Sequence, residues 1–105
     1  MIITGKKSWT GSPAHIWESE FASVIAEGMR AIEEFAKRAA ECGANGPELL
    51  AMRLGVHEAI VNAIRHGNQF DPKKRVRLLY QFVGAEARIE VEDEGSGFDL
   101  SDVPD

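Results

Sequence analysis

Two short segments of the chain carry an acid, an amide and a glycine-rich acidic loop, which together could hold a nucleotide. Residues 58–67 read EAIVNAIRHG, and residues 93–99 read DEGSGFD. The first segment is expected to end a helix and the second to end a strand, so both can face one cleft. Polar groups beside backbone that a flat ligand can approach closely predict a nucleotide-binding site.

The helical segment places its polar residues on one stripe. Glu58, Asn62 and His66 follow one another at intervals of four residues, and residues at this spacing share a helix face. Ala51 and Gly55 lie in the same sector, so a partner of the stripe could come close to the backbone. The helix alone leaves two interpretations open: a ligand covers the stripe, or the stripe faces solvent with His66 near the negative end of the helix dipole.

The strand supplies a second, independent indication. Residues 86–92 alternate between small or apolar and charged side chains, which predicts a strand with one buried face. Asp93 continues the inward set, and a buried carboxylate is costly unless hydrogen-bond donors meet it. Gly95 and Gly97 follow in a loop that can take unusual dihedral angles. An acidic turn that caps the strand would produce the same pattern.

Composition limits the class of protein before any motif is weighed. The chain has 105 residues, of which 44% are hydrophobic and 28% charged, as in a single small soluble domain. No apolar run is long enough to span a membrane and no signal-peptide pattern opens the chain, so we expect a cytoplasmic protein. The single Cys42 cannot form an internal disulfide. The net charge of -5 argues against general binding to nucleic acid.

Two helices are expected to position the first segment. Apolar residues recur at intervals of three and four over residues 20–42, which predicts an amphipathic helix that ends at Gly43. The Asn-Gly-Pro sequence at residues 45–47 predicts a turn and the start of a second helix. This helix is expected to reach about His66, with Gly67 as its stop.

The second helix is expected to be buried on several sides, because its apolar residues cover most of its circumference. These residues are Leu49, Leu50, Met52, Leu54, Val56, Ile60, Val61, Ala63 and Ile64.

Two strands are expected to position the second segment. Apolar and polar side chains alternate over residues 75–83, and residues 86–92 form the partner strand, joined through Gly84 and Ala85 as a hairpin. Residues 8–17 are a further strand candidate, interrupted by glycine and proline. The first few residues are expected to be loose.

The two segments resemble the sequence boxes of a known family. E-x-x-x-N-A-x-x-H-G at residues 58–67 and D-E-G-x-G-F-D at residues 93–99 are similar to the N-box and the first glycine box of the GHKL ATPase and kinase superfamily. Among its branches the chain most resembles the anti-sigma factor serine kinases of bacteria, because histidine and glycine follow the Asn-Ala pair. Sensor histidine kinases usually have a lysine and an aromatic residue there. The resemblance covers most of the chain.

The resemblance implies a role for each residue of the two boxes. Asn62 would bind the magnesium ion that bridges the nucleotide phosphates, since an amide oxygen is a hard ligand that suits this ion. Glu58 would be the general base that accepts the proton of an attacking serine hydroxyl or water. Asp93 would accept a hydrogen bond from the adenine amino group and so select ATP over GTP. The remaining members of the implied nucleotide-binding set are Ala63, His66, Gly95 and Gly97.

The resemblance also implies a fold and an activity. The fold would be an α/β two-layer sandwich of the Bergerat type, with helices on one face of a mixed, mostly antiparallel sheet. The protein would be an ATP- and Mg²⁺-dependent serine/threonine-protein kinase that dimerises and sequesters a sigma factor. It would phosphorylate an antagonist protein to keep this antagonist from releasing the sigma factor. No direct contact with nucleic acid or membrane is expected.

Family members continue past the first glycine box through a mobile lid and a second glycine box, whereas the sequence stops at Asp105. Residues 1–105 are therefore expected to form one ATP-binding domain that is incomplete at its C-terminus. A different class of function stays open, namely a non-catalytic module that binds an adenine nucleotide or a protein. A third interpretation, a structural domain without a ligand, would leave both the polar stripe and the inward Asp93 as chance features.

Overall fold

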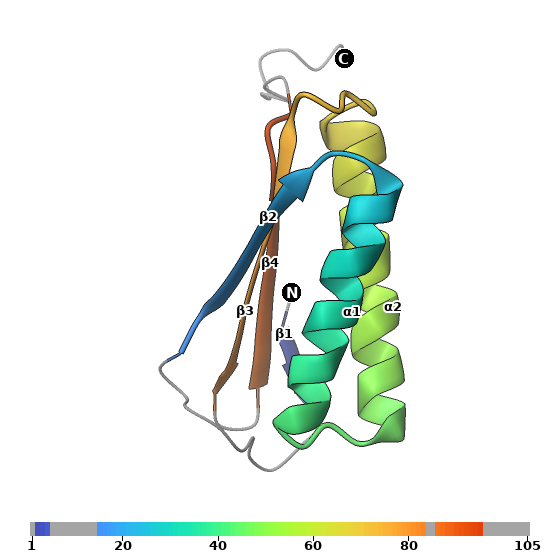
Figure 1. Cartoon of the computed structure of the whole chain (residues 1–105). Helices are drawn as coiled ribbons and strands as arrows, with labels where there is room; N and C mark the ends of the chain where they lie inside the picture. The colour runs from blue at the N-terminus through green and yellow to red at the C-terminus, as the bar shows by residue number, and fades with distance from the viewer. Residues whose placement is uncertain (1, 5–14, 84–85, 96–105) are drawn as a thin grey trace, which may run out of the picture.

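The chain folds into two layers, a sheet and a pair of helices. The computed structural model describes residues 2–4, 15–83 and 86–95. Helices α1 and α2 lie side by side against one face of the sheet (Figure 1), which confirms the predicted α/β two-layer sandwich. In chain order the elements are β1 (Ile2–Thr4), β2 (Trp17–Ala22), α1 (Ile25–Glu41), α2 (Gly46–Asn62), the π-helical turn η1 (Ala63–Gly67), β3 (Arg75–Val83) and β4 (Glu86–Asp93).

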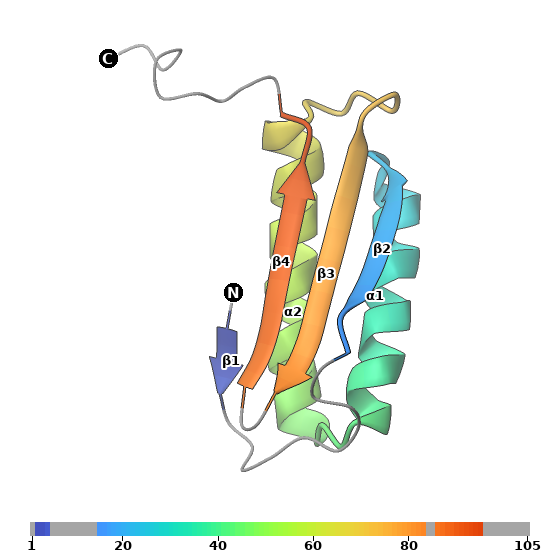
Figure 2. The ribbon, with the colours of Figure 1, turned by 90° about the vertical axis from the view of Figure 1, so that its left-hand side faces the viewer.

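The sheet has the strand order β1-β4-β3-β2 (Figure 2). Every pairing among the described strands is antiparallel. Val83 pairs with Glu86 and Val76 pairs with Asp93, so the predicted hairpin is confirmed and its second strand includes Asp93. The expectation that the first residues are loose was wrong for β1, whose Ile3 pairs with Ala87. A run of three residues that includes two isoleucines and a threonine suits an added edge strand.

The first helix begins later than its periodicity predicted. Residues 20–22 belong to β2, and α1 starts at Ile25 after Val24, whose extended backbone (φ -130°, ψ 146°) ends the strand segment. In β2 the charged residues Glu18 and Glu20 are exposed and alternate with less exposed neighbours such as Phe21. This alternation with a period of two runs into the helical periodicity of the next residues. Pairing with β3 makes residues 20–22 part of a strand and not the start of the helix. Of the strand candidate at residues 8–17, only residues 15–17 are described, and the strand starts at Trp17.

The start of the second helix follows the sequence closely. The side chain of Asn45 accepts a hydrogen bond from the backbone N–H of Glu48 (2.8 Å), and the Glu48 carboxylate accepts one from the backbone N–H of Asn45 (2.9 Å). This capping box, with Pro47 in the first turn, satisfies donors that a helix start leaves open. Gly43 takes a positive φ of 101° just after α1, as a glycine at a helix end commonly does.

Burial of α2 on several sides was a wrong prediction. The helix buries a single stripe of Met52, Val56 and Ile60, whereas Leu50 and Leu54 are 59% and 62% exposed. In a two-layer fold a helix meets the sheet and one neighbouring helix, so its outer face stays uncovered by any described residue. In the described part of the chain no helix is long and apolar enough to cross a membrane.

The core lies between the sheet and both helices. Phe35 packs edge-on against Tyr80 (4.9 Å between ring centroids), and both side chains are buried. The hydroxyl of Tyr80 accepts a hydrogen bond from Arg38 (2.9 Å), and burial raises the pKa of Tyr80 above its ordinary value. Gly28 of α1 faces Ile60 of α2, where an added Cβ would lie 2.8 Å from a methyl carbon. These contacts fix α1 against β3 and α2 against α1, and so help to place the end of α2 beside β4.

Candidate functional site

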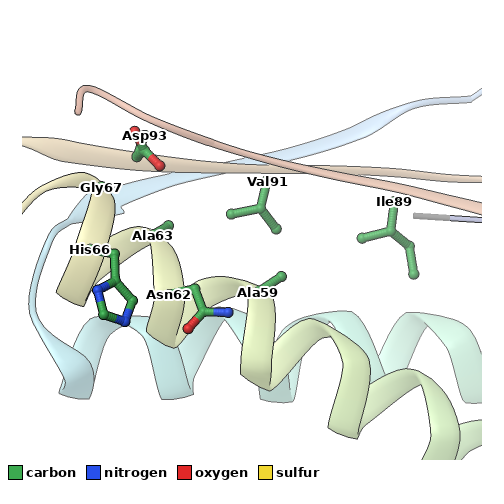
Figure 3. Close-up of a pocket in the computed structure, with 8 residues that line it drawn as sticks. All are labelled: Ala59, Asn62, Ala63, His66, Gly67, Ile89, Val91 and Asp93. Atoms are coloured by element: carbon green, nitrogen blue, oxygen red, sulfur yellow. The ribbon is translucent and has the colours of Figure 1, made fainter. Parts of the chain in front are cut away.

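A pocket of about 500 Å³ opens between the end of the helix layer and β4. This volume falls within the range of small-molecule sites. Figure 3 shows Ala59 and Ala63 facing Val91 and Ile89 across the pocket, with Asp93 at one end. The lining residues are Ala59, Asn62, Ala63, His66, Gly67, Ile89, Val91 and Asp93. The walls are therefore mostly apolar, and the polar groups lie at the rim.

The helical wall of the pocket ends in a π-helical turn. Residues Ala63–Gly67 form η1 directly after α2, and the backbone N–H of Asn68 bonds to the carbonyl of Ala63 (2.8 Å). π-helical turns are rare in proteins overall, but those that occur often lie at functional sites. Asn62 and His66 are exposed, and in Figure 3 their polar ends are directed away from β4. They therefore offer an amide and an imidazole at the outer rim of the pocket.

The opposite rim carries the carboxylate of Asp93. This residue ends β4 and lines the pocket together with Ile89 and Val91, which agrees with its predicted inward parity. It is exposed rather than buried. Its Oδ1 atom accepts a hydrogen bond from the backbone N–H of Gly95 (2.7 Å). A carboxylate at the edge of a pocket can accept further hydrogen bonds from a ligand, because each of its oxygens has more than one lone pair.

Two glycines allow this carboxylate to lie against the backbone. A Cβ built on Gly67 would overlap the Asp93 carboxylate. A Cβ built on Gly95 would lie 2.6 Å from Oδ1 of Asp93 and 2.8 Å from the carbonyl oxygen of Gly67. Both distances are shorter than ordinary contacts between nonbonded heavy atoms. The end of η1 and the start of the acidic loop thus touch each other only because neither residue has a side chain.

The structure gathers most of the residues that the sequence singled out. Asn62, Ala63, His66 and Asp93 line the pocket, and Gly95 bonds to Asp93. Glu58 is exposed one turn before Asn62 and is outside the lining set. Gly97 lies outside the described residues.

Sequence reasoning missed several residues of the pocket itself. Ala59, Ile89 and Val91 form its apolar walls, and Gly67 forms its floor beneath Asp93. The strand alternation did mark Ile89 and Val91 as inward residues. Nothing in the linear pattern indicated that Gly67 would contact β4, because the contact joins residues far apart in the chain.

The arrangement fits a flat heteroaromatic ring that carries an amino group. Methyl and branched side chains on both walls can contact the faces of a ring. The close approach of the Asp93 carboxylate to the backbone of Gly67 places this acceptor at the end of the pocket. Asp93 can accept a hydrogen bond from an exocyclic amine. The adenine base has both properties. The amide of Asn62 lies on the opposite rim, where it could contact a polar tail of the ligand and a cation bound to that tail.

Comparison with known families agrees with this geometry. The family model for the histidine kinase-like ATPase domain matches residues 22–105. The match spans both helices, the hairpin and both sequence boxes. No curated protein and no solved structure gives a significant match.

Proposed function

The chain belongs to the family of histidine kinase-like ATPase domains, and from this premise we propose that it binds ATP in the pocket between α2 and β4 and transfers phosphate to a serine of a protein substrate. The observation that carries the proposal is the position of Asp93. Its carboxylate lies against Gly67 at the end of an apolar pocket. This is the position from which a carboxylate can accept a hydrogen bond from the adenine amino group.

Glu58 and the polar residues at the rim each have a proposed task. Asp93 would hold the adenine amine, and Asn62 would hold the magnesium ion through its amide oxygen. The ion would supply charge neutralisation for the phosphates. Glu58 accepts the proton of the serine hydroxyl as this oxygen bonds to the γ-phosphorus and the bond to the ADP oxygen breaks. His66 contributes an imidazole to the same rim.

We further propose the pathway in which the kinase acts. The resemblance to anti-sigma factor kinases supports a homodimer that holds a sigma factor and phosphorylates an antagonist protein. The protein substrate is then this antagonist, and phosphate on its serine prevents it from releasing the sigma factor. Partner switching of this kind needs ATP binding first, so the binding step is the one to test first.

The binding step is tested by isothermal titration of Mg²⁺-ATP and, separately, Mg²⁺-GTP into the folded chain. We expect ATP to bind and GTP to bind at least about tenfold more weakly, because guanine places a carbonyl where adenine has its amine and would leave the Asp93 carboxylate facing an acceptor. Equal affinities for the two nucleotides would contradict the role given to Asp93. Absence of ATP binding by folded protein would overturn the proposed function.

One observation favours a second candidate, an adenine-nucleotide-binding module without turnover. The proposed base Glu58 is exposed and does not line the pocket. A module of this kind would bind ATP with the same preference over GTP but would transfer no phosphate. Transfer of phosphate from ATP to a candidate antagonist protein therefore separates the two candidates.

Replacement of Gly67 by alanine is expected to weaken ATP binding by about tenfold, the effect of one misplaced hydrogen bond to a charged group. The added methyl group would occupy the place of the Asp93 carboxylate and displace it from the pocket rim. Titration of ATP into the folded variant measures the effect. Gly46→Ala is the matched control, because a Cβ at Gly46 meets nothing within 4 Å. Unchanged ATP affinity of Gly67→Ala would show that the contact between Gly67 and Asp93 has no part in binding.

A further inference from the structure

Asn68 is a buried polar residue immediately after the π-helical turn. Its side chain is completely buried, and a buried amide requires hydrogen-bond partners. Its amide nitrogen donates to Oγ of Ser23 (3.1 Å) and to the backbone carbonyl of Arg75 (2.9 Å). Its amide oxygen accepts from the backbone N–H of Glu94 (2.9 Å). One side chain thus joins the segment after β2, the start of β3 and the end of β4.

The backbone around Asn68 is held in an unfavourable conformation. Gln69 and Phe70 both have positive φ angles, 52° and 59°, in the left-handed region that residues with a Cβ rarely occupy. Phe70 is 57% exposed, so packing of its own ring does not hold it there. Backbone hydrogen bonds from Phe70 to the carbonyl of Ile64 (2.8 Å) and from Asp71 to the carbonyl of Asn68 (3.0 Å) hold the turn. The buried side chain of Asn68 anchors the start of the turn to the neighbouring strands. Strained backbone that the surrounding structure maintains is frequent where a site must be positioned.

Asn68 adjoins the candidate site on its strand side and on its helix side. Its acceptor oxygen holds the N–H of the peptide that joins Asp93 to Glu94. On the helix side Asn68 follows Gly67, over which the Asp93 carboxylate lies. The same residue therefore fixes the strand end that carries the carboxylate and the helix end against which the carboxylate rests.

We propose that Asn68 is a positioning residue for adenine recognition: it sets the place of the Asp93 carboxylate without touching the nucleotide. The inference rests on the proposed ATP binding. A carboxylate selects between bases by the direction of its hydrogen bond, so movement of its peptide would lower both ATP affinity and the preference for ATP over GTP.

Asn68→Ala is the test, with Ser23→Ala as the matched control. Both substitutions remove the buried hydrogen bond between the two side chains, but only the first removes the bonds to Arg75 and Glu94. For the folded variants and the wild type, isothermal titration gives the affinities for Mg²⁺-ATP and Mg²⁺-GTP, and thermal unfolding gives the stability. Amide hydrogen exchange of the wild type and of both variants reports the protection of the Glu94 N–H.

The expected result is specific to Asn68→Ala. Its ATP affinity falls by about fivefold, the effect of one neutral hydrogen bond, and its preference for ATP over GTP falls by a similar factor. Ser23→Ala lowers the unfolding temperature but keeps the wild-type preference. In the hydrogen-exchange measurement, the Glu94 amide is protected in the wild type and in Ser23→Ala and loses protection in Asn68→Ala.

Four outcomes would overturn the inference. If Asn68→Ala keeps the wild-type preference, or if both variants lose it equally, Asn68 serves stability alone while the proposed ATP binding stands. If Asn68→Ala does not fold, a Glu94 amide that exchanges without protection in the wild type overturns the inference. A folded wild type that binds no ATP overturns the proposed function and this inference with it.

Discussion

Replacement of Glu58 by glutamine is expected to slow phosphate transfer from ATP to a protein serine by at least about 100-fold, the usual effect of removing a general base. Glutamine keeps the size and helix preference of the residue but cannot accept the proton. In the described part of the chain no hydrogen bond or ion pair engages the Glu58 carboxylate, so the substitution breaks no structural contact there. ATP affinity should therefore stay within about twofold of the wild type, because a base that acts in the transition state adds little to ground-state binding.

The measurement is the rate of phosphate transfer from saturating ATP to a candidate antagonist protein, together with the ATP affinity by titration. Glu41→Gln provides the control, because Glu41 is an exposed glutamate at the end of α1, at the other end of the helix layer from η1 (Figure 1). A Glu58→Gln variant that transfers phosphate at the wild-type rate would remove Glu58 from the mechanism. Absence of turnover in the wild type, with ATP bound, would instead favour the module that binds without catalysis.

Local signals in the sequence predicted the elements that bear the site. The alternation over residues 75–83 matches β3, and the Asn-Gly-Pro turn with its capping box matches the start of α2. Gly43 follows the end of α1 with the positive φ expected of it. Each of these features depends on side chains within a few residues of one another, which is why a linear pattern could specify them.

Features set by the whole fold were not predictable in the same way. Apolar residues surround α2 in the helical projection, yet Leu50 and Leu54 are exposed, because the number of layers decides how many faces of a helix are covered. The pattern over residues 20–24 suited a helix, but pairing with β3 makes most of it part of a strand. In both cases tertiary contacts outweighed local preference.

The candidate site shows the same division. Asn62, His66 and Asp93 stood out by type and spacing, and the structure places them around one pocket. Gly67 was expected only as the stop of the helix, and Asn68 was not singled out, because their importance comes from contacts with the end of β4 and Glu94, more than 20 residues away. A sequence pattern thus indicated which groups could bind a ligand, and the structure added the residues that hold those groups in place.

Replacement of Asp93 by asparagine is expected to weaken ATP binding by about tenfold to 100-fold, the range for a hydrogen bond to a charged group. The asparagine side chain is nearly the same size, so it should remain against Gly67, but its oxygen is a weaker acceptor for the adenine amine. Its amide N–H can donate to the guanine carbonyl. GTP affinity should therefore not fall, and the preference for ATP should shrink or reverse.

Titration of both nucleotides into the folded Asp93→Asn variant measures these changes. Glu90→Gln removes the same charge from β4 at an exposed position outside the pocket lining, so it should leave both affinities within about twofold of the wild type. If Asp93→Asn and Glu90→Gln weaken ATP binding equally, the loss of affinity comes from the general charge of the strand and not from a hydrogen bond to adenine. A selective change in Asp93→Asn would assign base recognition to one carboxylate, whose place is set by the absence of a side chain at Gly67.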